Sequence, residues 1–96
     1  MRFIQIIEYR TSRPDELKAV VEAHRPSLND GSLAVRGTAT QDREDPTLYR
    51  NIVEFESWEA AQQNSARPEI SAFAQAMMAV CDGPPTFYNL DVIEDY

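Results

Sequence analysis

The chain has 96 residues and a mass of 10.9 kDa, a length that favours a single domain spanning 1–96. Hydrophobic residues make up 43% and charged residues 26%, so the composition is that of a folded globular protein and excludes global disorder. The 16 acidic residues outnumber the 9 basic ones and give a net charge of −7. That charge argues against a nucleic-acid partner and against an anionic membrane surface, because both would repel it.

The apolar stretches and the counts of cysteine, histidine and glycine restrict where the protein is expected to be located and which cofactors it is expected to bind. The first eight residues become polar too early for a signal peptide, and no stretch approaches the roughly 20 apolar residues of a membrane span. Cys81 is the only cysteine and His24 the only histidine, too few for an internal disulfide or a zinc site. None of the 3 glycines has the spacing of a phosphate-binding loop. We therefore expect a soluble, cytoplasmic protein with no metal and no cofactor.

The first part of the chain alternates between strand and helix patterns. A run rich in isoleucine and aromatic residues over 3–9 predicts a strand that is apolar on both sides. Pro14, followed by two acidic residues, predicts the start of a helix. Apolar residues continue at helical spacing to Leu28, and Pro26 should end or kink that helix. A turn then leads to a moderate strand over 33–40.

The second part of the chain follows a polar loop. The expected elements are a strand over 48–55, a short helix over 58–63, a helix from 68 to about 81 and a strand over 86–93. Ser57 is placed to cap the short helix. The next helix begins at Pro68, and the glycine and prolines after it prevent its continuation.

The order β-α-β-β-α-α-β consists of two β-α-β halves and predicts a ferredoxin-like fold of the α+β class. Helices that follow the first and third strands must cover the same face of a four-stranded antiparallel sheet. The other face would be bare, although the first, third and last strands carry apolar side chains on both faces. A bare apolar face of this size is normally an interface. We therefore predict a homodimer in which two sheets pack face to face as an eight-stranded barrel.

One segment carries a family resemblance. The run Phe55-Glu56-Ser57-Trp58-Glu59-Ala60-Ala61, followed by Asn64-Ser65 and an amphipathic helix, resembles the antibiotic biosynthesis monooxygenase family of the dimeric α+β barrel superfamily. That family includes cofactor-independent monooxygenases of polyketide quinols and other electron-rich phenols, heme-degrading enzymes and proteins of unknown activity. The resemblance implies oxidation of a small aromatic or quinol-like substrate, without a cofactor, in a pocket between the helices and the sheet.

The resemblance also bears on which activity to expect. The heme-degrading members use an asparagine on the first strand, a tryptophan on the middle helix and a histidine on the next helix. The corresponding positions here hold Ile7, Asn64 and Ala74, so heme degradation by that route is not expected. The quinol-oxidising members use asparagine, tryptophan and tyrosine around their pocket. Asn64 and Trp58 supply two of these residue types at a different spacing.

Three residues are candidates for a catalytic role, namely His24, Asn64 and Trp58. His24 lies on the inward stripe of its helix and could act as a general base, but a histidine at the edge of the core, bonded to a backbone carbonyl, is the favoured interpretation. Trp58 could line a pocket for an aromatic ligand or seal its helix onto the sheet. Asn64 could contact a ligand or, with Ser65, cap the following helix.

Five residues are candidates for substrate binding, namely Phe73, Met77, Tyr49, Tyr88 and Arg50. Phe73 and Met77 would form an adaptable apolar wall, which core packing would explain equally well. Arg50 could clamp a carboxylate or enolate, or pair with Glu8, Glu54 or Asp91 across the sheet. Two other classes of function stay open: a non-oxidative cyclase or isomerase of polyketide-like substrates, and a non-catalytic dimeric binding protein.

Overall fold

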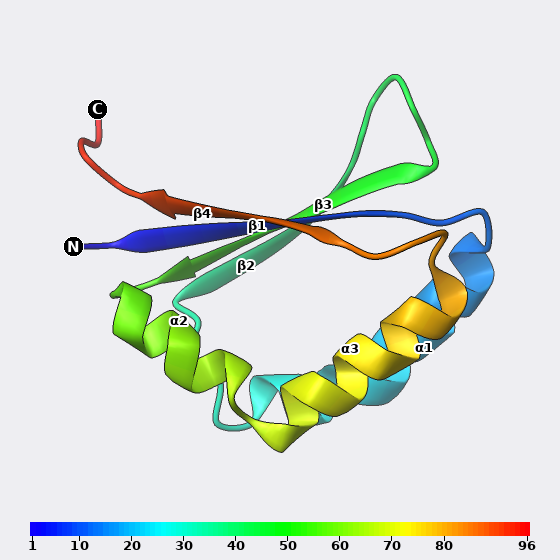
Figure 1. Ribbon diagram of the computed structural model, residues 1–96, viewed down its shortest axis with the longest axis horizontal. Coiled ribbons are helices and arrows are strands. Elements are labelled where there is room, and N and C mark those ends of the chain that lie inside the picture. The colour runs from blue at the N-terminus through cyan, green and yellow to red at the C-terminus, as the bar shows by residue number, and fades with distance from the viewer.

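The computed structural model describes residues 1–96 and has the predicted element order (Figure 1). The strands are β1 (Phe3–Arg10), β2 (Arg36–Gln41), β3 (Leu48–Phe55) and β4 (Thr86–Asp91), and the helices are α1 (Pro14–Asn29), α2 (Trp58–Ser65) and α3 (Pro68–Val80). The strands lie in the order β2-β3-β1-β4, and every neighbouring pair is antiparallel. The predicted ferredoxin-like α+β fold is confirmed. No helix is both long and apolar enough to cross a membrane.

All three helices lie on one side of the sheet (Figure 1). Side chains of directly opposed residues on neighbouring strands point to the same face, so the strand register divides the sheet into a covered and an uncovered face. The covered face carries Phe3, Gln5, Ile7 and Tyr9 of β1, with Phe55, Val53, Asn51 and Tyr49 of β3 and Asp91, Asn89 and Phe87 of β4. The uncovered face carries Ile4, Ile6 and Glu8, with Glu54, Ile52 and Arg50 of β3 and Leu90, Tyr88 and Thr86 of β4.

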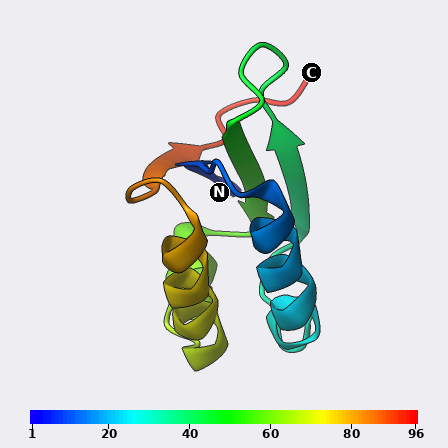
Figure 2. The same cartoon turned by 90° about the vertical axis from the view of Figure 1, so that its right-hand side faces the viewer.

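The buried core is small: besides a cluster at the α2 end of the covered face it includes Tyr9 and Leu17. Phe3, Phe55 and Ala61 form that cluster and hold α2 against β1 and β3. Ser57 caps α2 as predicted, because its Oγ accepts a hydrogen bond of 3.1 Å from the amide of Ala60. Helices α1 and α3 instead pack mainly on each other, side by side below the sheet (Figure 2).

Helices α1 and α3 are joined at both ends by hydrogen bonds to main-chain carbonyls. At the end nearer β1, the hydroxyl of Thr11 donates to the carbonyl of Val80 over 2.6 Å. At the opposite end, the guanidinium of Arg67 donates to the carbonyls of Ser27 and Leu28 over 3.0 and 3.3 Å. The last carbonyls of a helix have no hydrogen-bond partner within that helix. Arg67 therefore supplies donors to carbonyls at the end of α1 that would otherwise have none.

Several boundaries differ from those predicted from the sequence: β1 and β2 end one residue later and α2 two residues later than expected, and three further differences concern a proline in α1, the start of β2 and the end of β4. Helix α1 continues through Pro26, whose ring removes one amide donor near the helix end while its carbonyl still accepts a bond from the C-cap residue. Strand β2 begins at Arg36, three residues later than expected; the amides of Leu33 and Ala34 bond to the side chains of Asn64 and Ser32 and are therefore lost to the sheet. Strand β4 ends at Asp91, two residues earlier than expected.

Candidate functional site

Trp58 stands in the first turn of α2, over the covered face of the sheet. Its indole meets the ring of Phe3 edge-on, with centroids 5.0 Å apart and planes inclined by 63°. The side chain of Trp58 is nevertheless 42% exposed, although this contact links it to the core. Both functions considered for Trp58 are therefore compatible with its position: it fastens α2 to the sheet and presents ring surface to solvent.

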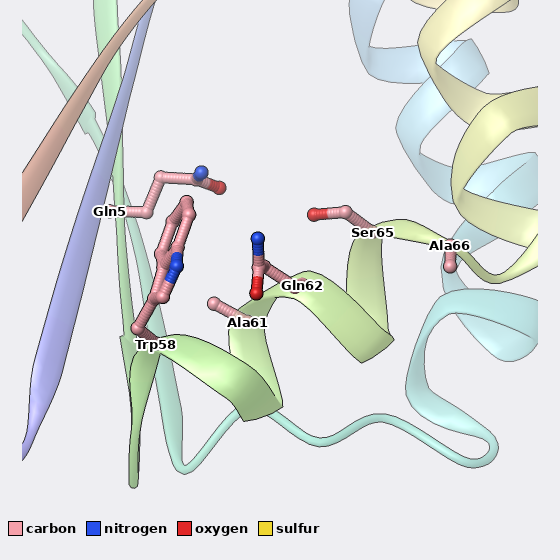
Figure 3. Close-up of a pocket in the computed structure, with 6 residues that line it drawn as sticks. All are labelled: Gln5, Trp58, Ala61, Gln62, Ser65 and Ala66. Atoms are coloured by element: carbon pink, nitrogen blue, oxygen red, sulfur yellow. The ribbon is translucent and has the colours of Figure 1, made fainter.

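A hollow of about 380 Å³ lies beside Trp58, between β1 and α2, and is named here the inner hollow. Its lining comprises Gln5, Trp58, Ala61, Gln62, Ser65 and Ala66. Figure 3 shows Gln5 extending from β1 and Gln62 and Ser65 extending from α2 toward the same space. The volume lies at the small end of the range for ligand pockets. The polar side-chain groups in the lining, two amides, a hydroxyl and the indole N–H, are all uncharged.

A second hollow of about 350 Å³ shares Trp58 as a wall and is named the edge hollow, because β4 is an edge strand. Its other lining residues are Phe3, Asn89 and Asp91. The side-chain amide of Gln5 donates a hydrogen bond of 3.1 Å to Asn89 Oδ1. The linings of the two hollows are therefore connected both by the indole and by this hydrogen bond.

His24 lies between α1 and α3 and lines neither of the two hollows. Its Nδ1 is 3.0 Å from the carbonyl oxygen of Val20, and its ring centroid is 5.6 Å from that of Phe73. A histidine bonded to a backbone carbonyl at the edge of the core was the favoured interpretation, and this is the geometry found. Phe73 and Met77 are half-buried on α3 and also lie outside the lining of both hollows.

Asn64 is buried and connects α2 to two other segments. Its Oδ1 accepts hydrogen bonds from the amide of Leu33 over 3.1 Å and from the guanidinium of Arg67 over 3.2 Å. The prediction that Asn64 or Ser65 caps α3 is wrong, because the N-cap residue is Arg67 and no side chain bonds to the first turn. Asn64 instead fixes the loop before β2, whereas Ser65 lines the inner hollow.

Arg50 and Tyr88 lie on the uncovered face and therefore do not meet the other candidates. Arg50 is opposite Glu8 and donates to it over 3.0 Å, as one of the predicted pairings requires, and it also donates to Asp42 over 2.9 Å. Hydrogen bonds to Asp42 and then to Glu8 raise the pKa of Arg50. Tyr88 is opposite Ile6 on the same face. Strand alternation thus excludes both residues from a pocket between the helices and the sheet.

Tyr49 lies on the covered face and stacks on Tyr9, with centroids 5.5 Å apart and planes inclined by 7°. Tyr9 is buried, and its hydroxyl donates a hydrogen bond of 3.1 Å to Asn51 Oδ1. Burial is the main cause that raises the pKa of Tyr9, so its hydroxyl stays a donor. Tyr49 thus belongs to a packed polar cluster on the sheet that lies outside the lining of both hollows.

Sequence reasoning missed Gln5, Gln62 and Asp91 as lining residues. The available signal for Gln5 was an amide on a strand side otherwise occupied by apolar and aromatic residues. Gln62 is one turn beyond Trp58 on α2, so a helical projection would have placed the two on neighbouring positions. Asp91 can be identified as a lining residue only from the pairing of β4 with β1, which places it opposite Phe3.

Cys81 is the C-cap residue of α3 and is half-buried. Burial, followed by the charge of Asp82, raises the pKa of its thiol. A thiol with a raised pKa is a weak nucleophile at neutral pH. No group of three or more histidine, cysteine, aspartate or glutamate side chains is arranged to hold a metal ion.

Comparison of the sequence with family models and with curated proteins finds no match. Comparison of the structure with solved structures finds many of the same fold. A proposed antibiotic biosynthesis monooxygenase from Caulobacter crescentus has a TM-score of 0.84 at 14% identity, over 97% of this chain and 91% of the other. SnoaB, a cofactor-independent oxygenase from Streptomyces nogalater, has a TM-score of 0.82 at 17% identity, over 98% and 95%.

A conserved protein from Methanosarcina mazei, whose name states no activity, is similarly close, with a TM-score of 0.83 at 8% identity over 94% of this chain and 91% of the other. At such identities the similarity shows the fold alone. The resemblance to antibiotic biosynthesis monooxygenases that the sequence predicted is thus confirmed for the whole fold.

Proposed function

We propose that this protein is a cofactor-independent monooxygenase that oxidises a small aromatic or quinol-like substrate in the inner hollow. The observation that carries the proposal is the half-exposed indole of Trp58, which forms a wall of a hollow whose polar lining is uncharged. The fold shared with SnoaB, which is named a cofactor-independent oxygenase, supports the same class of reaction.

The lining suits an aromatic ring with oxygen substituents. The ring would pack on the indole of Trp58 and on the methyl groups of Ala61 and Ala66. An aromatic pair contributes about 0.5–1.5 kcal/mol beyond the burial of area. The side chains of Gln5 and Gln62 would donate to a phenol oxygen, and donors to the charged form of an acid favour its ionisation. The hollow would therefore hold the phenolate, which is the more easily oxidised form.

In the proposed reaction the substrate supplies all the electrons. A hydroquinone reacts with O₂ to give a hydroxyquinone and water: one oxygen atom replaces a ring hydrogen and forms a new C–O bond, and the other leaves as water. Four electrons leave the substrate and four reduce O₂, so no other reductant is required. The proton that the phenol loses to solvent on ionisation is regained when the second oxygen atom leaves as water. The protein contributes binding, stabilisation of the phenolate and partial exclusion of water.

We also propose that two copies pair through the uncovered face. Ile52, Tyr88 and Leu90 are exposed there, and Ile4 and Ile6 are half-buried beside them. Exposed apolar side chains gathered on one sheet face mark an interaction surface, and a stable interface buries more than about 1,000 Å² in total. The ion pairs of Arg50 lie on the same face and would flank the contact.

Oxygen uptake with a panel of neutral hydroquinones tests the proposed reaction. The protein should consume O₂ faster than spontaneous oxidation does, and labelled O₂ should place one labelled atom in the product. Spontaneous oxidation to the quinone yields hydrogen peroxide and adds no oxygen to the ring, so the label separates the two. Conversion without O₂ uptake would show a cyclase or isomerase, and binding without conversion would show a binding protein.

A further inference from the structure

We infer that the edge hollow is a subsite for an organic ammonium group, so that the substrate is an aromatic ring with a short alkylammonium substituent. This inference rests on the proposed function, because it specifies the class of substrate that the inner hollow would oxidise. It depends on three observations: the chemistry of the edge hollow, the absence of an ion pair at Asp91, and the connection between the two hollows.

The edge hollow combines the exposed indole of Trp58, backed by the almost completely buried ring of Phe3, with the carboxylate of Asp91. Phe3 and Trp58 meet at 63°, so that their rings form a corner rather than a stack. Asp91 is directly opposite Phe3 in the register of β1 and β4 and lines the same hollow. The faces of aromatic rings attract cations, tryptophan most strongly, and aromatic walls are the usual means by which proteins recognise alkylammonium groups. The carboxylate supplies the opposite charge at the same place.

No basic side chain of the protein neutralises Asp91. It takes part in none of the ion pairs of the structure. Arg2, which precedes the residue opposite Asp91, is paired with Glu54 and Asp95 instead. Every charged side chain from Thr86 onward is acidic, and the whole chain has a net charge of −7. The edge hollow therefore holds a carboxylate without a basic partner, in a chain of net negative charge, and this favours a cation.

The two hollows can be occupied by one molecule. Both are lined by Trp58, and the hydrogen bond from Gln5 to Asn89 joins their linings along the sheet. A ring packed on the indole in the inner hollow would need only a short substituent to reach past the edge of Trp58 toward Asp91. The ring would then lie among uncharged groups and the ammonium beside the carboxylate.

Fluorescence titration tests the inference directly, because Trp58 is the only tryptophan and lies between the two hollows. The probes are 4-(2-aminoethyl)phenol and 4-ethylphenol, which share a ring and differ in the ammonium group. The dissociation constant of the ammonium compound should be about tenfold lower, the scale of one cation–π contact and one exposed ion pair. This preference should weaken as salt is added.

Substitutions at Asp91 test whether its carboxylate causes the preference for the ammonium compound. Asp91→Asn should reduce the ratio of the two dissociation constants to about one. Asp91→Glu, which keeps the charge, should retain most of the preference. Glu94→Gln removes one negative charge from the same segment and is the matched control, with the preference unchanged. Melting curves of the variants establish that each is folded.

Equal affinities of wild type for the two phenols would overturn the subsite, and so would a preference that Glu94→Gln lowers as much as Asp91→Asn. The proposed oxygenase reaction would be untouched in either case, since it is tested with neutral hydroquinones. Conversely, an ammonium preference that depends on Asp91, in a protein that oxidises no hydroquinone, would support the subsite and remove the proposed reaction.

Discussion

Trp58 packs edge-on against Phe3 with ring centroids 5.0 Å apart, and the same indole lines both the inner and the edge hollow. One residue thus connects the docking of α2 with the proposed binding site. Its stabilising contact and its exposed ring surface use different parts of the side chain, so substitutions can separate the two effects.

Trp58→Ala should lower the free energy of unfolding by about 2 kcal/mol through loss of the contact with Phe3 and reduce oxygen uptake per folded molecule at least about tenfold. Trp58→Phe should keep the edge-on contact with Phe3, so that the free energy of unfolding and the oxygen uptake both fall less than in Trp58→Ala. Denaturant titration and an oxygen electrode give the two quantities. Tyr96→Ala removes another exposed aromatic residue, one that lines neither hollow, and serves as control. Wild-type turnover in Trp58→Ala would contradict the proposed site.

His24→Ala should lower the free energy of unfolding by about 1 kcal/mol, because the ring packs against Phe73 between the two long helices. Oxygen uptake per folded molecule should be unchanged, since His24 lines neither hollow. The melting temperature and the turnover of this single variant distinguish a structural role of His24 from a catalytic one. A loss of roughly 10²-fold in turnover, the scale of a lost general base, would instead make His24 catalytic.

Asn64→Ala should lower the free energy of unfolding by about 1–3 kcal/mol, because the amide of Leu33 and one donor of Arg67 lose their shared acceptor. Gln63→Ala, at the exposed neighbouring position, should change it by less than about 0.5 kcal/mol. Equilibrium denaturation measures both. Equal effects of the two substitutions would show that the bonds of Asn64 do not stabilise the fold.

Sedimentation at micromolar concentration should show a dimer. Leu90→Asp should convert it to a monomer, because a charge on the uncovered face cannot be buried against a second sheet without a partner. Leu33→Asp is the matched control, since Leu33 is 41% exposed and Leu90 44%, and only Leu90 lies on that face. A monomeric wild type, or equal effects of the two substitutions, would disprove the interface.

The loop between β2 and β3 should show an acid-sensitive contribution to stability from Asp45. Hydrogen bonds from Thr47 and then from Arg10 lower the pKa of Asp45 to about 2 from its ordinary 3.8. A pKa lowered by folding means that the stabilisation is present above the ordinary pKa and is lost as the pH falls toward the folded value. The difference in melting temperature between wild type and Asp45→Asn should therefore be largest above pH 4 and decline toward pH 2. A difference that does not vary with pH would contradict this origin.

The sequence predicts the fold well because local signals determine it. The alternation along β1 and β3 and the cap at Ser57 depend on residues that are near one another in the chain. The site is harder to predict, because its composition depends on strand register. Tyr88 and Asn89 are adjacent in the sequence, yet one lies on the uncovered face and the other lines the edge hollow. Only the pairing of β4 with β1 distinguishes them.

Long-range polar contacts explain the remaining differences. A cap for α3 was a reasonable local expectation for Asn64, but its partner Leu33 is 31 residues away in the sequence. Arg67 likewise bonds to the end of α1 rather than to its own helix alone. Neither pattern has a periodicity or a spacing that sequence reading could detect. The family resemblance indicates a class of reaction, whereas the residues that line the hollows follow only from the three-dimensional fold.

The hydrogen bonds that connect α1 and α3 at both ends have a consequence for the way in which the two helices unfold. Thr11 and Arg67 link each helix to the main chain of the other, and Arg13 adds a bond of 2.7 Å to the carbonyl of Ala79. Since α1 and α3 contact each other more than they contact the sheet, we expect their amides to be protected from hydrogen exchange as one cooperative unit.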